Sequence, residues 1–528
     1  MLPGRYIKII CAVAINLTLF SFLGIIALSI LWHTKLTPFQ DYSLVIDVGS
    51  RHTKIFVYTW PADKSDGLGT TSRVSQVKSC SVSHEPITSV IHPTENNVKN
   101  YFDTGMTECI STIPSTRKSR ALIFLGATAG LRLFNITNPD YINRLLNATR
   151  AYFGTLGVLF DAPEFQVRII DGSEEGLSAW ISTNMLLKEL YEHHQPMETY
   201  GVTDMGGAST QLSFIAPDAT SEHYNLDLFG IDYDVYSHSY LCYGEEQARL
   251  VHQGQLVQEA NESYSIDDPC LQYGYTEEKS YEDLFNTACA RGKHAPSEGL
   301  NTSAIFSFVG AGDYKSCRIA MEKRFSNLSC TSSSCSFDNI YQPIPIPFSM
   351  KIIAISSWYE TFSALAANIS IEADEHDNYN FTSVNLTDIK HVIKEICKQS
   401  WSHVHKPTKH RPFLCFNSIH QWTLFEFGFH MTDENLKNFQ IVDKINSNNI
   451  GWTLGYMINQ TNYLSPEHRP ARLLTQQEFI ILLVLSIILF LTGSITTTVI
   501  IYRYKQYYQQ SKTISRKNEI FNEINIEN

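Results

Sequence analysis

Hydrophobic residues follow two different patterns along this 528-residue chain. Two runs near the ends, residues 9–32 and 479–502, are almost entirely apolar. As a helix, each is long enough to cross a hydrocarbon layer about 30 Å thick. Between them, short apolar stretches of strand length alternate with glycine-rich turns and with helical patterns. The pattern predicts a large α/β region held between two membrane-spanning helices.

Basic residues flank both apolar runs on their outer sides. Arg5 and Lys8 precede the first run, and five lysines or arginines follow the second. The positive-inside rule then predicts that residues 1–8 and 503–528 are cytoplasmic and that residues 33–478 lie outside the cytoplasm. The first run is longer than the core of a cleaved signal peptide, and no small-x-small cleavage site stands out. We therefore expect a retained anchor.

A short polar phrase occurs twice between strand-like runs, and each copy predicts a tight hairpin. Residues 47–53 read DVGSRHT and residues 204–210 read DMGGAST, about 157 residues apart. Glycines allow a close backbone approach to a phosphate, and successive N–H groups with nearby hydroxyls form an anion nest. The aspartate that ends each strand is placed to hold a hydrated divalent cation. Two copies predict two related lobes that face one nucleotide.

Two further segments between these loops carry candidate chemistry. The strand-like residues 122–125 run into the small residues 126–130 and then a helix, which predicts an anion site at the helix start or simple close packing. A strand at residues 166–170 precedes Glu174 and Glu175, and a helical pattern follows over residues 177–193. Such glutamates often only complement the helix dipole. We favour Glu175 as the base that activates water, because Gly176 leaves room beside it.

Composition places residues 33–478 in an oxidising compartment. Ten of the 11 cysteines lie between the apolar runs, which predicts disulfides without fixing their pairing. Glycosylation sequons support the same compartment and begin at Asn135, Asn147, Asn261, Asn301, Asn327, Asn368, Asn380, Asn385 and Asn459. The net charge of −12 argues against a nucleic-acid partner. A nucleotide would bind through loop amides and a metal instead.

The last third of the chain adds a strand at residues 352–355 that leads into Ser356, Ser357, Trp358 and Tyr359. These aromatic residues predict either core packing or a ring that stacks on a nucleobase. The late segment 451–457, GWTLGYM, predicts a return of the chain to the first lobe. Residues 465–478, which contain two prolines, predict a juxtamembrane stalk.

Six segments taken in order resemble the ecto-nucleoside triphosphate diphosphohydrolases, or ecto-apyrases. They read DVGSRHT, LGATAGLRL, DGSEEGLSAW, TDMGGASTQ, SSWYETF and GWTLGYM. The resemblance spans nearly the whole chain. It implies an α/β fold of two ribonuclease H-like lobes of the actin and sugar-kinase superfamily, with one transmembrane helix at each end. The lobes would comprise residues 33–160 with 429–464, and residues 161–428.

The resemblance also implies roles for individual residues. Asp47 and Asp204 would organise Ca²⁺ or Mg²⁺, Glu175 would be the general base, and Ser209 and Gln211 would position water. The phosphate contacts would come from Ser50, Arg51, His52, Thr128, Ala129, Gly206, Gly207, Ala208 and Ser209. Tyr359 is the nearest candidate for base stacking. The implied disulfides are Cys80–Cys109, Cys242–Cys289, Cys270–Cys317, Cys330–Cys335 and Cys397–Cys415.

The chain departs from this family at a few positions. Arg51 stands where a serine is usual, and Glu360 occupies a position that is often aromatic. The expected substrates are extracellular ATP, ADP, UTP and UDP at a plasma membrane, with homo-oligomers through the membrane helices as a further expectation. A sugar or acetate kinase would share the loops but work in the cytosol. A non-catalytic receptor would be expected to lose Asp47, Glu175 or Asp204, all of which are present.

Overall fold

The structure is a computed structural model of the whole chain. It describes all residues except 1–3, 35–38, 51, 84, 194, 261–262, 291–300, 327–333, 367–372, 375–377, 383, 404–410, 447, 468–472 and 525–528. The chain divides into two compact units, which are described separately. One comprises Met1–Phe39 with Glu467–Asn528, and the other comprises Gln40–Pro466.

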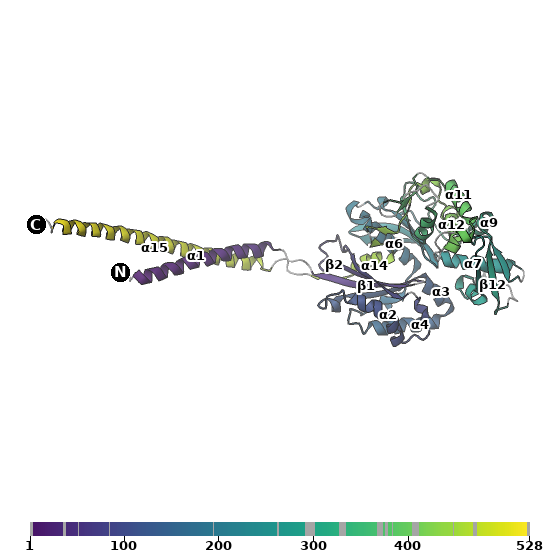
Figure 1. The fold of residues 1–528 in the computed structure, drawn as a ribbon, viewed down its shortest axis with the longest axis horizontal. Coiled ribbons are helices and arrows are strands. Elements are labelled where there is room, and N and C mark those ends of the chain that lie inside the picture. The colour runs from purple at the N-terminus through teal and green to yellow at the C-terminus, as the bar shows by residue number, and fades with distance from the viewer. Residues whose placement is uncertain are drawn as a thin grey trace. The chain divides into compact units, whose positions relative to one another are not determined.

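The first unit consists of the two terminal helices, α1 (Gly4–His33) and α15 (Gln476–Ile524) (Figure 1). Both are long and apolar enough to cross a membrane, as the sequence predicts. They pack against each other through aromatic pairs. The rings of Trp32 and Phe479 stack with centroids 4.4 Å apart, and those of Phe22 and Phe490 lie 6.1 Å apart. Helix α15 continues well past the apolar run, since 49 residues extend about 74 Å.

The second unit begins with a five-stranded sheet in the order β3-β2-β1-β4-β5. Its strands are β1 (Gln40–Val48), β2 (Thr53–Pro61), β3 (Ser75–Ser83), β4 (Leu122–Ala127) and β5 (Val167–Ile169). Side chains alternate across β1: Leu44 and Ile46 pack under the helices of the first lobe, whereas Val45 faces the opposite core. The covering helices are α2 (Glu95–Ile110), α3 (Ala129–Thr137), α4 (Pro139–Phe153) and the short α5 (Pro163–Gln166).

A seven-stranded sheet forms the second lobe, in the order β14-β15-β13-β6-β7-β9-β8. Its strands are β6 (Gly201–Met205), β7 (Ser209–Ile215), β8 (His223–Leu228), β9 (Ile231–Leu241), β13 (Ile352–Ser356), β14 (Tyr379–Asn380) and β15 (Phe439–Ile441). Strand β6 pairs antiparallel with β7 and parallel with β13, just as β1 pairs antiparallel with β2 and parallel with β4. The repeated phrase therefore marks the same place in two related sheets.

Two helices join the lobes, α6 (Gly172–Leu186) and α14 (Trp452–Thr461). They lie between the helices α2 and α4 on one side and α11 and α12 on the other (Figure 1). They cross very closely, because a Cβ on Gly455 would lie 1.9 Å from the Ser178 carbonyl oxygen. The Gly455 N–H also donates to the Ser182 hydroxyl at 2.7 Å. A larger residue at 455 would push α14 away from α6.

The remaining elements decorate the second lobe. Its helices are α7 (Glu245–Glu259), α8 (Tyr281–Phe285), α9 (Tyr314–Ser326), α10 (Ser357–Leu365), α11 (Leu386–Cys397), α12 (Leu414–Thr423) and α13 (Asp433–Leu436). A small sheet contains β10 (Ser265–Asp268), β11 (Thr276–Ser280) and β12 (Ile305–Gly310), and a hairpin contains β16 (Lys444–Ile445) and β17 (Asn448–Asn449).

Four of the implied disulfides are present in the structure. They are Cys80–Cys109, Cys242–Cys289, Cys270–Cys317 and Cys397–Cys415. Cys330 lies outside the described residues, so its pairing with Cys335 stays a prediction. The same holds for the sequons at Asn261, Asn327 and Asn368.

The chain passes from one sheet to the other at later residues than the lobe boundaries expected from the sequence. Residues 167–169, expected in the second lobe, form β5 and pair with β4 of the first sheet. Residues 439–441, expected in the first lobe, form β15 and pair with β13 of the second sheet. Both are three-residue strands at which a neighbouring strand decides the sheet, and local sequence carries no such signal. The segment 451–457 does return to the first lobe: α14 packs on β1 and β2.

Candidate active site

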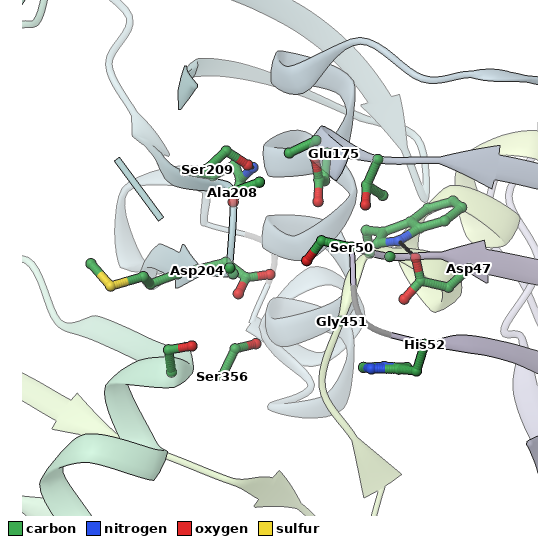
Figure 2. Close-up of a pocket in the computed structure, with 18 of the residues that line it drawn as sticks. Asp47, Ser50, His52, Glu175, Asp204, Ala208, Ser209, Ser356 and Gly451 are labelled. Carbon is green, nitrogen blue, oxygen red and sulfur yellow. Dashed lines mark hydrogen bonds between the residues drawn. The ribbon is translucent and has the colours of Figure 1, made fainter. Parts of the chain in front are cut away.

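A cavity of about 320 Å³ lies between the two lobes. Its wall is built from both repeated loops, the β4–α3 junction, the start of α6, the β13–α10 junction and residues 443–453. Of the site residues expected from the sequence, those that line it are Asp47, Ser50, His52, Thr128, Ala129, Glu175, Asp204, Gly206, Gly207, Ala208, Ser209 and Gln211. Segments far apart in the sequence therefore converge on one space (Figure 2).

The two repeated loops have the same turn geometry. The Gly49 N–H donates to the His52 carbonyl at 3.1 Å, and the Gly206 N–H donates to the Ser209 carbonyl at 2.9 Å. In the second loop, the carbonyls of Gly206 and Gly207 accept hydrogen bonds from the first turn of α7. The Gly206 N–H is used within the turn, so Gly207 and Ala208 are the loop residues whose N–H groups can form an anion nest.

Glycines let neighbouring segments press directly against these loops. A Cβ on Gly130, at the start of α3, would lie 2.7 Å from the Ser50 Cα. A Cβ on Gly244 would lie 2.5 Å from the backbone nitrogen of Ala208. Thr128 is fixed beside the first loop by its N–H, which donates to the Val48 carbonyl at 3.1 Å. In the β4–α3 segment, Thr128 and Ala129 thus face the cavity, and Gly130 allows the start of α3 to pack against Ser50.

Asp47 and Asp204 lie one residue before the ends of β1 and β6, and they approach the cavity from opposite sides (Figure 2). Burial raises the pKa of Asp47 to about 6. The Trp452 indole N–H donates to Asp47 Oδ1 at 3.0 Å and opposes this increase, whereas the charge of Asp204 raises the pKa further. Burial also raises the pKa of Asp204, against a hydrogen bond from Ser356. Two desolvated carboxylates that repel each other favour a bound cation.

Glu175 lies in the first turn of α6, and its carboxylate points toward the space between the two aspartates (Figure 2). The turn is fixed by the N-cap residue Asp171, whose side chain accepts from the Ser173 N–H at 2.8 Å. Burial raises the pKa of Glu175 to about 7, with Arg132 lowering it and both aspartates raising it further. This value suits a general base at neutral pH.

Two residues extend a hydrogen-bond network from Glu175. Arg132 Nη2 donates to Glu175 Oε2 at 2.8 Å and to the Ser209 hydroxyl at 3.3 Å. Gln211 Nε2 donates to the same hydroxyl at 2.8 Å. The guanidinium is buried, and its Nε and Nη1 have no hydrogen-bond partner in the part of the chain that the structure describes. Glu175, Ser209 and Gln211 thus lie together, as the resemblance implies.

Glu174 lies outside the cavity, which agrees with the choice of Glu175 as the candidate base. It forms an ion pair with Arg168 at 2.5 Å and does not line the cavity. The reason given for that choice was wrong, however. Gly176 leaves no room for water, because a Cβ there would lie 2.7 Å from the Ser237 hydroxyl and 2.8 Å from that of Ser213. Its role is to let α6 pack on β7 and β9.

The outcome differs for the two remaining expected site residues, Arg51 and Tyr359. Arg51 lies outside the described residues. Tyr359 does not line the cavity; it packs against the core of the second lobe with its ring 6.1 Å from that of Tyr379. The core-packing alternative therefore describes Tyr359 better than base stacking. On α10, Ser357 and Glu360 line the cavity, and Tyr359 is rotated about 100° from Glu360 around the helix axis, toward the core.

Sequence reasoning missed several residues at or beside the site, among them Arg132, Ser356, Trp452 and Glu360. Arg132 is the only charged residue in LGATAGLRL, which was an available signal. Ser356 has φ of 64° at the end of β13, a strained conformation for a residue other than glycine. Its hydrogen bond to Asp204 shows what the strained turn positions. Trp452 gave no signal, since its partner Asp47 lies 405 residues earlier.

The donor set at the aspartates fits a hard divalent cation. Asp47 and Asp204 supply carboxylate oxygens, and the hydroxyls of Ser50, Thr128 and Ser356 line the same cavity. Oxygen donors of this kind suit Ca²⁺ or Mg²⁺, which retain water ligands when few protein groups bind them.

A cavity between two related α/β lobes, with a glycine-rich loop and an aspartate from each, defines an enzyme of the actin-like superfamily. Comparisons with known proteins narrow the class. The model of the GDA1/CD39 (nucleoside phosphatase) family matches residues 34–471. The chain belongs to this family and is a hydrolase of the apyrase type.

Curated relatives match over most of their length. Ectonucleoside triphosphate diphosphohydrolase 8 of Gallus gallus is 31% identical over 479 residues, which cover 85% of this chain and 90% of the relative. Ectonucleoside triphosphate diphosphohydrolase 1 of Bos taurus is 29% identical over 500 residues, covering 91% and 93%. The crystal structure of nucleoside triphosphate hydrolases from Neospora caninum shares the fold, with a TM-score of 0.58 at 15% identity, covering 80% of this chain and 93% of that one.

Proposed function

We propose that this protein hydrolyses nucleoside tri- and diphosphates, among them ATP, ADP, UTP and UDP, outside the cytoplasm. The observation that carries the proposal is the position of Glu175: a buried carboxylate with a raised pKa that faces two phosphate-type loops and two aspartates. The family and the named relatives support nucleotide substrates.

The backbone of the two loops holds the terminal phosphates, assisted by Ser50, His52, Thr128 and Ala129. Asp47 and Asp204 would hold Ca²⁺ or Mg²⁺. When bound, the cation neutralises charge on the phosphate oxygens. The loops and the two aspartates come from different lobes, so the relative position of the lobes sets the alignment of the phosphate. Phosphoryl transfer depends mainly on such positioning and charge stabilisation.

Glu175 accepts the proton of the attacking water. The water oxygen forms a bond to the terminal phosphorus as the bond from phosphorus to the bridging oxygen breaks. The products are inorganic phosphate and the nucleotide shortened by one phosphate. Ser209 and Gln211 orient the water, since they are hydrogen-bonded to each other beside the carboxylate. Arg132 holds Glu175 in place and favours its ionised form.

The test replaces each of the adjacent glutamates in the full-length chain. Glu175→Gln removes the proton acceptor and is expected to lower phosphate release from ATP about 10²–10⁴-fold, the usual contribution of a general base. Glu174→Gln is the matched control, because this neighbour is bound to Arg168 outside the cavity. Near-full activity of the Glu175→Gln protein, folded and present at the membrane, would contradict the assignment. Activity that persists in EDTA would contradict the roles of Asp47 and Asp204 in holding the cation.

The proposed location is the plasma membrane, with two membrane-spanning helices, the enzymatic unit outside and both ends of the chain in the cytoplasm. Exposed sequon residues at Asn147, Asn301 and Asn380 offer a test. Glycosidase treatment should increase the gel mobility of the protein, and intact cells should hydrolyse added ATP. Unglycosylated protein with activity only after permeabilisation would reverse the orientation. Homo-oligomers through α1 and α15 remain a proposal of the same kind.

A further inference from the structure

One stretch of chain, residues 242–248, lies directly behind the second phosphate loop; it is called the backing segment below. The Cys242 N–H donates to the Ala208 carbonyl at 2.9 Å. N–H groups at the start of α7 donate to the carbonyls of Gly206 and Gly207 at 3.0 Å. Three consecutive carbonyls of the loop are therefore bound by the backing segment, so the position of this segment sets the position of the loop.

The backing segment begins with an unfavourable turn. Cys242 has φ of 75°, a left-handed conformation that is uncommon for residues other than glycine. The turn carries the chain from β9 into α7 and brings Gly244 against the loop, where a Cβ would lie 2.5 Å from the Ala208 nitrogen. A strained conformation of this kind persists only where the surrounding structure holds it. The groups that bind the Cys242 peptide are therefore important for the loop.

Arg324, on α9, binds the backing segment at both of its ends. Its Nη2 donates to the Cys242 carbonyl at 2.8 Å, and its Nη1 donates to the Ala248 carbonyl at 2.9 Å. The guanidinium also lies over the ring of Tyr243, 4.5 Å from the ring centroid. A guanidinium is suited to this contact, because its rigid fork can donate to two acceptors at once.

These contacts differ from those of an ordinary ion pair. Among the residues that the structure describes, no carboxylate forms an ion pair with Arg324, and its buried Nε has no hydrogen-bond partner. Its hydrogen bonds go to backbone carbonyls of the backing segment instead. A charged donor strengthens such hydrogen bonds, so the guanidinium holds the two carbonyls more firmly than a neutral group would.

His420, on α12, binds the same segment between these two points. Its Nε2 lies 2.9 Å from the Tyr243 carbonyl. Burial and the charge of Arg324 lower the pKa of His420 to about 3, so the imidazole is neutral at pH 7 and can donate through Nε2. The consecutive carbonyls of Cys242 and Tyr243 are thus bound from two different helices.

We propose that Arg324 is a positioning residue for the second phosphate loop and acts through the carbonyls of Cys242 and Ala248. The inference rests on the proposed function, because the loop affects catalysis only when it binds a phosphate. Gly207 and Ala208, whose N–H groups can contact that phosphate, are also the residues whose carbonyls the backing segment binds. Without the guanidinium, the turn at Cys242 relaxes and the loop shifts. A misplacement of about 1 Å can lower a rate about 100-fold.

The test replaces Arg324 in the full-length protein. Arg324→Met removes the donors but keeps most of the side-chain length, so kcat for ATP should fall about 10–100-fold. Arg324→Lys keeps the charge without the fork and should retain more activity than Arg324→Met. Arg318→Met is the matched control, because this arginine lies on the same helix but pairs with Glu322 and Glu426. Its kcat should equal that of wild type.

Product inhibition separates a shifted loop from general damage to the fold. Inorganic phosphate binds at the loops, so its inhibition constant should rise about 10-fold in Arg324→Met. AMP is not a substrate of the proposed reaction, and its phosphate does not occupy the attacked position. Its inhibition constant should therefore change less than about 2-fold. If Arg324→Met does not fold, both constants are measured for Arg324→Lys, where the constant for phosphate should again rise more than that for AMP.

Two results would overturn the inference: an equal rise of the inhibition constants for phosphate and AMP, or a kcat of Arg324→Met within about 2-fold of wild type. If wild type hydrolyses no nucleotide, the proposed function fails instead. Calorimetric binding of inorganic phosphate to wild type and Arg324→Met then tests the loop without turnover, and equal affinities would refute the role of Arg324.

Discussion

Arg132 offers a sharp test of how the site prepares its base. Its guanidinium lies 2.8 Å from Glu175, with 15% of the Arg132 side chain and 12% of the Glu175 side chain exposed. An arginine this close typically lowers the pKa of a carboxyl by about 1–3 units. Arg132→Gln should therefore raise the pKa of Glu175 from about 7 to roughly 8–10. At pH 7 the ionised fraction of Glu175 would fall from about one half to between about a tenth and a thousandth.

Since only ionised Glu175 accepts a proton, activity at pH 7 should fall about 5–500-fold and recover as the pH rises. The assay is the pH dependence of kcat between pH 6 and 10 for wild type, Arg132→Gln and Arg132→Lys. Lysine keeps the charge, so its profile should lie closer to that of wild type. A thermal melt checks folding, because removing one partner of a buried ion pair can be strongly destabilising. If kcat falls to half its maximum on the acid side at the same pH in Arg132→Gln as in wild type, the reasoning is refuted.

Two further predictions concern the residues that support the site. Trp452→Phe removes the N–H that donates to Asp47, so the pKa of Asp47 should rise further and half-maximal activity should need about 10-fold more Ca²⁺ or Mg²⁺. Trp180→Phe is the control, because that buried indole N–H has no described partner; equal metal titrations for both variants would contradict the prediction. Gly244→Ala places a methyl group 2.5 Å from the Ala208 nitrogen. It should lower kcat at least about 100-fold, whereas the melting temperature should change only modestly. Full activity of this variant would show that the second loop tolerates displacement.

Local sequence was enough to find the central elements of the fold. The runs at 9–32 and 479–502 predict the terminal helices, because twenty or more apolar residues have few alternatives. The phrases at 47–53 and 204–210 predict two hairpins, because aspartate and glycine between strand-like runs define such turns. The structure confirms both hairpins and gives them equivalent sheet neighbours.

Helix boundaries show where local signals stop. The helical pattern expected to begin at residue 177 begins at Gly172 instead, because Asp171 caps it. It ends at Leu186, and Lys188 follows with φ of 69°, outside the helical region. The short strands β5 and β15 were assigned to the wrong lobe for a related reason. Three residues carry too little pattern to choose a sheet, so pairing with β4 and β13 decides it.

The sequence by itself determined the residue types of the site: the two aspartates, Glu175 and the glycine-rich loops that surround a cavity. Only the tertiary structure decided which distant groups act on them. Arg132 reaches Glu175 across 43 positions, and Trp452 reaches Asp47 across 405. It also turned Tyr359 into the core and Glu360 to the cavity wall. Local patterns record backbone preference and polarity, whereas the pKa of a carboxyl and the contacts of a ligand depend on which segments the packed lobes bring together.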